Sequence, residues 1–210
     1  MNAKLILKDG EIFEGQSFGY EQPSSGELVF STGMVGYPES LTDPSYQGQI
    51  LVFTYPIIGS YGVPNQKYWE SSSIHVSGLI VSQYIDTPSH FHSQMSLGEW
   101  LKKEKIPGLV ISDTRYITQK LRDKGTQLAK IIFDTSTSLS INTSSTFSIN
   151  FDDSNKKNLV AAVSTLRVSK EGQGIKTVVL IDCGVKENIR RCLINRGVRL
   201  ITVPWNFNIF

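Results

Sequence analysis

The 210-residue chain has little of several features that assign proteins to a class. It holds only two cysteines, Cys183 and Cys192, which are too few for the disulfide framework of a small secreted protein. Its formal net charge is only +2, with both signs interspersed, so no basic surface for nucleic acid is predicted. The longest apolar runs, such as 178–181, have the length of a strand, and no membrane span is predicted.

The first residues and the glycines also lack familiar signals. The N-terminus has neither the apolar core of a secretory signal nor the Arg- and Ser-rich character of a transit peptide. A cytoplasmic location is therefore expected. Gly15, Gly19 and Gly26 match neither the dinucleotide-binding nor the P-loop pattern, so the chain is expected to hold no nucleotide cofactor.

Local signals in the first 150 residues favour strands over helices. Asp9-Gly10 joins two alternating runs and predicts a hairpin with a type I′ turn. Ser96 and Glu99 form a capping box that opens a helix ending near residue 105. Asp113 or Thr114 begins a second helix, which Gly125 ends. Further strands are predicted at 27–32, 50–55, 74–83, 109–111 and 127–133. These elements predict a mixed β/α domain over residues 1–150.

The next segment changes in composition. Residues 134–158 are dominated by Ser, Thr, Asn and Asp, and they offer too few apolar side chains to repay the entropy of ordering. We predict a loop there, a short helix at 159–166 and a domain boundary at 169–174. The expected linker is 151–175.

From residue 176 the pattern becomes that of a parallel sheet. A continuous apolar run at 177–182 predicts a buried strand, and Cys183-Gly184 a turn. A helix is predicted at 186–196 and a second strand at 198–203, which makes one β-α-β unit of a doubly wound sheet over 176–210. Strands of this kind need neighbours and helices on both faces, so the unit is incomplete by itself.

The stretch from residue 32 to 64 is unusual for a loop. It contains five glycines, four prolines and four tyrosines around one apolar strand. Glycine permits positive φ and close backbone approach, whereas proline restricts φ. This composition predicts a rigid, shaped surface suited to holding a ligand or a partner.

This stretch and four later blocks carry a resemblance to a known family. The blocks are TGMVGYPESLTDPSYQGQILVFTYPIIGSYGVP (32–64), ESSSIHVSGLIV (70–81), PSHFHSQMSLGEWLKKEKIPGL (88–109), DTRYITQKLRDKG (113–125) and IDCGVKENIRRCLINRGVRLITVPW (181–205). They resemble the small subunit of glutamine-dependent carbamoyl phosphate synthetase, most of all the version fused into the multifunctional pyrimidine-pathway protein, and the similarity fails mainly at 134–175. The resemblance implies an N-terminal swivelling-type β/β/α domain followed by the opening of a class I glutamine amidotransferase domain with a flavodoxin-like fold.

The resemblance also implies a function. The N-terminal domain would dock on the synthetase large subunit, or on a fused synthetase domain that binds ATP and magnesium. Ammonia released from L-glutamine would pass to that partner for carbamoyl phosphate synthesis in the pyrimidine or arginine pathway. The glutaminase cysteine belongs to a later G-x-C-x-G elbow, so no catalytic residue is expected in this chain. Two alternatives stay open, a non-catalytic partner or scaffold of the synthetase and an independent hydrolase that uses Cys183.

Ser45, in the sequence DPSY, is the one substrate-binding residue we predict. The resemblance implies that its hydroxyl hydrogen-bonds the substrate L-glutamine. A hydroxyl both donates and accepts, so it matches either an amide or a carboxylate. The alternative is a local turn or cap serine beside Asp43-Pro44.

Other polar residues are given structural roles. Cys183 lies between a strand and a helix, as a nucleophile would, but no histidine follows it in the sequence. His75, His90 and His92 lack a further ligand at metal-binding spacing, so a polar loop is preferred over a metal site.

Two groups of charged residues can be explained by helix structure. Asp113-Thr114-Arg115 matches the family's D-T-R block, and either an interface contact or a helix cap with a locally paired arginine would explain it. Lys186, Arg190 and Arg191 are interpreted as the solvated face of their helix.

Overall fold

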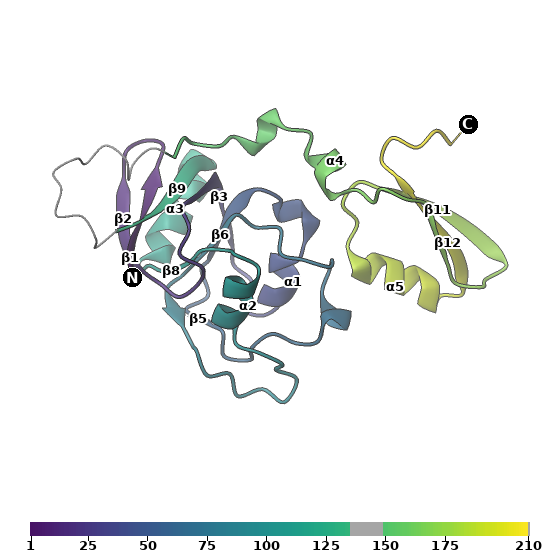
Figure 1. Cartoon of the computed structure of the whole chain (residues 1–210), viewed down its shortest axis with the longest axis horizontal. Helices are drawn as coiled ribbons and strands as arrows, with labels where there is room; N and C mark the ends of the chain where they lie inside the picture. Colours follow the sequence, from purple (N-terminus) through teal and green to yellow (C-terminus); the bar gives the residue numbers. More distant parts are fainter. Residues whose placement is uncertain (135–148, 210) are drawn as a thin grey trace.

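A computed structural model describes residues 1–134 and 149–209, and most of the expected loop at 134–158 lies outside these ranges. The described chain forms two lobes that lie side by side (Figure 1). We call residues 2–133 the barrel lobe and residues 169–204 the second lobe. The segment between them carries the short helices η3 (Ser154–Lys156) and α4 (Leu159–Val163), the latter within the helix predicted at 159–166.

The barrel lobe is built on one closed sheet. Its strands follow the order β1-β2-β8-β6-β4-β3-β9, and β9 pairs with β1 to close it. The run β3-β4-β6-β8 is parallel, and the remaining pairs are antiparallel. The strands are β1 (Asn2–Leu7), β2 (Ile12–Ser17), β3 (Ser24–Ser31), β4 (Gln49–Phe53), β6 (Gly78–Val81), β8 (Gly108–Val110) and β9 (Gln127–Phe133). A separate two-stranded sheet pairs β5 (Ile57–Ile58) with β7 (Gln83–Tyr84).

The predicted hairpin is confirmed, but its turn type is wrong. A type I′ turn needs positive φ at both central residues. Gly10 has a φ of +95°, whereas Lys105 is the only non-glycine residue with positive φ in the described ranges, so Asp9 is not left-handed. The connection spans residues 8–11, and the Gly10 N–H donates to the Leu7 carbonyl at 3.0 Å. A four-residue connection needs only one left-handed position.

The long strand predicted at 74–83 is also wrong. Strand β6 covers only Gly78–Val81. The backbone before it bonds to a neighbouring loop, because the His75 N–H donates to the Leu41 carbonyl at 2.9 Å and the His75 carbonyl accepts from Gly48 at 3.2 Å. Apolar composition alone does not show which backbone groups are already paired.

Three helices pack on the barrel lobe: α1 (Tyr37–Leu41), α2 (Leu97–Lys103) and α3 (Thr114–Lys124). The capping box of α2 is confirmed, with Ser96 and Glu99 each accepting from the other's backbone N–H. The side chain of Asp113 caps α3 by accepting from the Tyr116 N–H at 2.9 Å, and Gly125 ends that helix. The helix starts were therefore predictable from their caps.

The core lies on both faces of the closed sheet. Ile50 and Val52 belong to one buried cluster with α3, whereas Leu51 and Phe53 belong to another with α1 and α2. Alternate residues of a strand point to opposite faces, so β4 contributes to both clusters. Residues 44–46 lie just before this strand in the chain.

The second lobe contains the predicted β-α-β unit. Strands β11 (Lys176–Asp182) and β12 (Val198–Pro204) are parallel and connected through α5 (Glu187–Asn195). Strand β10 (Ser169–Glu171) pairs antiparallel with β12, so residues inside the expected linker belong to this sheet. The 1–150, 151–175 and 176–210 boundaries stay a prediction. The mixed α/β class is confirmed, and no helix in the described ranges is long and apolar enough to span a membrane.

Candidate functional site

The residues around Ser45 form a short turn at the barrel lobe's contact with the second lobe. The 3₁₀ helix η1 (Pro44–Tyr46) is capped by Asp43, whose Oδ1 accepts from the Ser45 N–H at 2.9 Å. Asp43 is buried, whereas Ser45 is exposed. The cap of this turn is therefore Asp43 and not Ser45. The Ser45 hydroxyl makes no hydrogen bond with any residue that the structure describes.

The loops beside this turn are held by two tyrosines. The rings of Tyr37 and Tyr61 stack with their centroids 4.2 Å apart. The Tyr37 hydroxyl donates to the Gly62 carbonyl at 2.6 Å, and the Tyr61 hydroxyl accepts from the Gly36 and Tyr37 N–H groups. Burial raises the pKa of Tyr61 to about 12, so its phenol stays protonated at neutral pH. These contacts join the start of α1 to the loop at Tyr61 and Gly62.

Asp43 also joins the two lobes. Its Oδ2 lies 2.6 Å from Lys186 Nζ, and the Asp43 side chain is only 7% exposed. The hydrogen bond to Asp43 raises the pKa of Lys186 above its ordinary value of 10.5. A buried carboxylate needs such partners, because an unpaired one loses its hydration without compensation. One carboxylate therefore fixes both the Ser45 turn and the start of α5.

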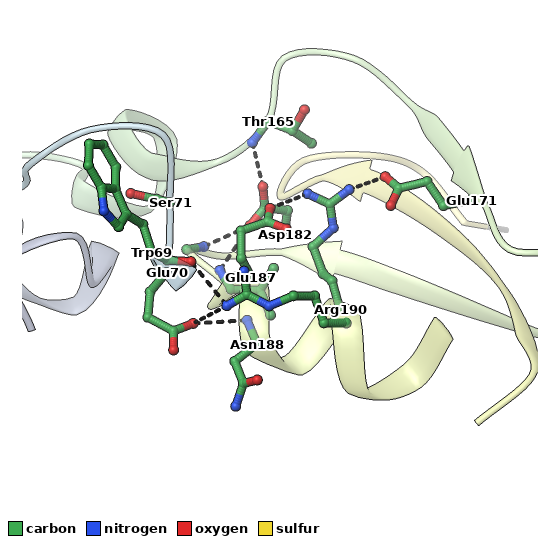
Figure 2. A network of polar contacts seen from close by, with 12 residues as sticks. Trp69, Glu70, Ser71, Thr165, Glu171, Asp182, Glu187, Asn188 and Arg190 are labelled. Carbon is green, nitrogen blue, oxygen red and sulfur yellow. Dashed lines mark hydrogen bonds and ion pairs between the residues drawn. The ribbon is translucent and has the colours of Figure 1, made fainter. Parts of the chain in front are cut away.

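The N-terminus of α5 is capped from the barrel lobe. Lys186 occupies its N-cap position and supplies no side-chain cap of its own. Instead the Glu70 carbonyl accepts from the Glu187 N–H at 2.8 Å, and the Glu70 carboxylate accepts from the Asn188 N–H at 2.9 Å (Figure 2). Free N–H groups and the helix dipole make this end of a helix favourable for a carboxylate. Glu70 thereby holds α5 against the barrel lobe.

The side chain of Arg191 adds a second attachment from α5 to the same segment. Its guanidinium donates to the Lys67 carbonyl at 2.6 Å and to the Trp69 carbonyl at 3.1 Å. It also lies 4.0 Å from the Glu70 carboxylate. The segment from Lys67 to Glu70 therefore supplies the polar contacts that join α5 to the barrel lobe.

The neighbouring Arg190 is bound within its own lobe. Its guanidinium pairs with Glu171 on β10 and with Glu187 at 2.5 Å, and its side chain is only 20% exposed (Figure 2). The prediction of a solvated face is therefore wrong for Arg190 and Arg191, which are partly buried, whereas Lys186 is 46% exposed. All three guanidinium or ammonium groups have partners on neighbouring segments, which the helix sequence alone does not reveal.

The turn after β11 is ordered by another buried carboxylate. Asp182 Oδ1 accepts from the Gly184 and Val185 N–H groups, each at 3.0 Å, and its Oδ2 accepts from the Thr165 N–H at 2.7 Å. Cys183 is exposed between these residues and forms no hydrogen bond within the described part of the chain. No base is therefore in contact with the Cys183 thiol there.

Gly184 brings this turn against the Ser45 turn. Its φ is +92°, and a β-carbon at this position would lie 3.2 Å from Pro44 Cβ and 2.7 Å from Val163 Cγ2. A larger residue would therefore be strained and would push the two turns apart. The structure thus brings Ser45 close to the carboxyl end of β11, where parallel sheets commonly place their ligands.

His75 lies in a polar network behind the Ser45 turn. One ring nitrogen lies 2.6 Å from Gln47 Oε1 and the other 2.9 Å from Ser71 Oγ. Burial lowers the pKa of His75 below its ordinary value of 6.5, and the nearby Asp43 carboxylate partly opposes this. His75 is therefore a structural residue that connects the two loops.

The other two histidines, His90 and His92, do not contact the His75 network within the described residues. His90 and His92 are both exposed, and their rings both lie against Phe91 with their centroids 5.6 Å apart. The described residues contain no group of three His, Cys, Asp or Glu side chains that could hold a metal ion. No site for a metal can therefore be assembled from the residues that the structure describes.

The Asp113-Thr114-Arg115 block lies at the start of α3. Asp113 is the helix cap, as one of the two interpretations expected. Arg115 is exposed and forms no ion pair with the described residues, so the local pairing expected for it is wrong. Nothing in the contacts brings this block to the Ser45 turn.

Comparison with known proteins agrees with this architecture. Residues 5–131 match the family described as carbamoyl-phosphate synthase small chain, CPSase domain. Multifunctional protein ura1 of Schizosaccharomyces pombe is 44% identical over 97% of this chain and 10% of its own length. Multifunctional protein URA2 of Saccharomyces cerevisiae is also 44% identical, over 97% of this chain and 11% of its own length. Carbamoyl-phosphate synthase [ammonia], mitochondrial, of Homo sapiens is 44% identical over 97% of this chain and 14% of its own length. The chain spans a small fraction of these relatives, and it belongs to the carbamoyl-phosphate synthase small chain family.

Proposed function

We propose that this chain frames the L-glutamine site of a glutamine-dependent carbamoyl phosphate synthetase, with Ser45 as a substrate-binding residue. The observation that carries the proposal is the exposed Ser45 hydroxyl, which has no partner in the described residues. The turn that bears it is held by the buried Asp43 and, through it, by Lys186 of the second lobe. A rigid turn can present a hydroxyl to a substrate with little further loss of entropy.

In this proposal the two lobes have different tasks. The barrel lobe is a swivelling-type β/β/α domain, and the β-α-β unit belongs to a flavodoxin-like class I amidotransferase domain. Glutamine hydrolysis proceeds through a cysteine thioester whose tetrahedral intermediates need an oxyanion hole. Cys183 is not that nucleophile, because no base contacts it among the described residues.

The proposed partner is a synthetase large subunit or a fused synthetase domain. Two of the similar relatives are multifunctional proteins by name and a third is a carbamoyl-phosphate synthase, which supports a synthetase in the same polypeptide or complex. That partner would bind ATP and magnesium and receive the ammonia for carbamoyl phosphate, in pyrimidine or arginine biosynthesis. We place this work in the cytoplasm, although the human relative is mitochondrial by name.

A chimera tests the role of Ser45. The matching segment of the Saccharomyces cerevisiae multifunctional protein is replaced by this chain, and carbamoyl phosphate synthesis is measured with glutamine or with ammonium as the nitrogen source. We expect Ser45→Ala to raise the KM for glutamine roughly tenfold, the effect of one lost hydrogen bond to a substrate. Synthesis from ammonium should not change, because it bypasses the glutamine site.

Ser112→Ala is the matched control, since Ser112 is also exposed and lies beyond β8. It should leave both activities unchanged. A Ser45→Ala chimera with an unaltered KM for glutamine would contradict the assignment of Ser45. Glutamine hydrolysis by the 210-residue chain alone, abolished by Cys183→Ala, would contradict our interpretation of Cys183 and favour the independent hydrolase.

A second candidate function is that of a non-catalytic partner or scaffold. It is favoured by the human relative, whose printed name specifies ammonia and which is as similar to this chain as the multifunctional proteins are. In that case the chimera would support synthesis from ammonium only, and Ser45→Ala would have no effect on either activity.

A further inference from the structure

A pocket away from the Ser45 turn has the properties of a binding site. It encloses about 370 Å³ between the start of α1, the loop after Tyr61 and the loop that carries two of the histidines. Its lining combines aromatic and aliphatic side chains with a single acidic residue. The lining includes Val35, Glu39, Tyr61, Tyr68, His90 and His92.

Glu39 is the chemically unusual member of this pocket. Its Oε2 is buried and has no hydrogen-bond partner among the described residues. Four other buried side-chain atoms in those ranges share this state, and none of them belongs to a carboxylate. A desolvated carboxylate oxygen is costly unless a donor or a cation compensates it. The rest of the Glu39 side chain is partly exposed at the pocket, so a cationic ligand there would compensate this carboxylate.

No cation of the described chain fills this role. Lys67 is the nearest candidate in sequence, but its ammonium lies over the ring of Tyr68, 4.9 Å from the centroid. Lys67 and Glu39 do not form an ion pair within the described ranges. The position of Lys67 shows that the Tyr68 ring already attracts a positive charge.

The aromatic walls favour a planar cation. The rings of Tyr61 and His90 meet edge to face at 6.4 Å, and those of Tyr68 and His92 lie 5.8 Å apart. A guanidinium group can stack on such rings while donating hydrogen bonds in its own plane. A lysine ammonium is a more strongly hydrated point charge and gains less from these walls.

The surface around the pocket indicates that the ligand belongs to a protein. Three large apolar side chains near it are strongly exposed, with Met34 at 69%, Val35 at 78% and Phe91 at 83% of their full accessibility. Exposed apolar side chains gathered around a pocket are typical of protein interfaces, and arginine is a frequent anchor there. A free small cation would leave this apolar rim uncovered.

We propose that this pocket is a docking site for an arginine side chain presented by a protein partner. The guanidinium pairs with the Glu39 carboxylate, whose side chain is partly exposed at the pocket, and stacks on an aromatic ring of the lining. Apolar residues that flank the arginine cover Met34, Val35 and Phe91. The proposal goes beyond the proposed function and does not depend on the role of Ser45.

Short peptides test this site on the intact 210-residue chain. The probe is N-acetyl-Leu-Arg-Phe-amide, and the comparison is the same peptide with citrulline, which has the shape of arginine without its charge. A lysine peptide is the third ligand. Binding is followed by the chemical shifts of backbone amides in the titrated chain. We expect the arginine peptide to bind roughly 10–100-fold more tightly than the citrulline peptide and to shift amides around the pocket.

Two variants assign that preference to the pocket. Glu39→Gln preserves the shape of the side chain and should remove the preference for arginine over citrulline. Glu14→Gln, which changes an exposed carboxylate on β2, should retain it. The inference is overturned if the arginine and citrulline peptides bind equally, if Glu39→Gln keeps the preference, or if no pocket amide shifts at the solubility limit. Equal binding of the lysine peptide would overturn the choice of guanidinium.

Discussion

Replacing Glu70 should loosen α5 without unfolding the barrel lobe. In Glu70→Ala the Asn188 N–H loses its carboxylate acceptor, whereas the Glu187 N–H keeps the backbone carbonyl of residue 70. Loss of a helix cap costs about 0.5–2 kcal/mol, and loss of a carboxylate beside the helix dipole adds about 0.3–1 kcal/mol when the site is exposed. The Glu70 side chain is only 12% exposed, so the effect should lie near the upper part of the range, about 2 kcal/mol.

Amide hydrogen exchange is the appropriate measurement, because it reports each lobe separately. A loss of about 1–2 kcal/mol corresponds to an exchange rate about 5–30 times faster for the amides of α5. Amides of the β1–β2 pair should exchange at the rate of the unaltered chain, since Glu70 has no contact with those strands. Glu70→Gln should give a smaller effect, because its amide oxygen still accepts the hydrogen bond but carries no charge.

Glu21→Gln is the control for a change of charge by itself. Glu21 is 42% exposed and, among the described residues, forms an ion pair only with the N-terminal amine at 3.4 Å, so this variant should leave α5 unaffected. If Glu70→Ala speeds exchange equally in both lobes, Glu70 supports the barrel lobe and the capping argument is wrong. If α5 exchanges at an unchanged rate, the cap contributes nothing measurable.

Three further changes follow from the same contacts. Lys186→Met leaves the buried Asp43 without its cation and should destabilise the second lobe by about 1–2 kcal/mol, measured by urea unfolding. The loss should be smaller than for a fully buried ion pair, because Lys186 is 46% exposed. Since its folded pKa is raised, the contribution of Lys186 is present below pH 10.5 and is lost at higher pH, and the Met variant should lack this loss. The pKa of His75 is lowered in the folded chain, so the unfolded chain takes up the proton first as pH drops. The free energy of unfolding should therefore fall below pH 6.5, and His75→Gln should reduce this fall. An unchanged pH profile in that variant would contradict the prediction. Gly184→Ala should cost more than about 1 kcal/mol in thermal unfolding, through its positive φ and its contact with Val163, and an unchanged Tm would show that the turn relaxes freely.

Much of the fold was predictable because its signals are local. The capping box at Ser96, the cap at Asp113 and the glycine after each long helix mark boundaries within a few residues of sequence. The β-α-β unit was predictable because two apolar runs flank an amphipathic helix. The closed sheet was not, because it depends on which of several similar strands pair, and β3 pairs in parallel with β4 but antiparallel with β9.

The candidate site was predictable only in part. Ser45 was singled out by resemblance, and the structure adds that its turn is capped by Asp43 and that Ser45 is exposed. The roles of Asp43 and Glu70 were missed, since each carboxylate bonds to a segment more than a hundred residues away. One feature of the sequence could have indicated that α5 is capped from outside the helix. Lys186 precedes a helix without a good capping residue, which suggests that the cap comes from elsewhere in the chain.

The contact between the lobes matters because the second lobe has little core of its own. Val178 and Leu180 lie on the face of β11 that α5 covers, whereas Val179 and Ile181 on the other face are 53% and 42% exposed. A three-stranded sheet covered on one face buries little apolar surface, so the free energy gained by burial barely exceeds the cost of ordering the chain. Its stability must then depend on the polar contacts that Asp43 and Glu70 make to Lys186 and α5. The same contacts bring the β11 turn to Ser45, so the order of the second lobe and the geometry of the candidate site should change together in any variant that weakens them.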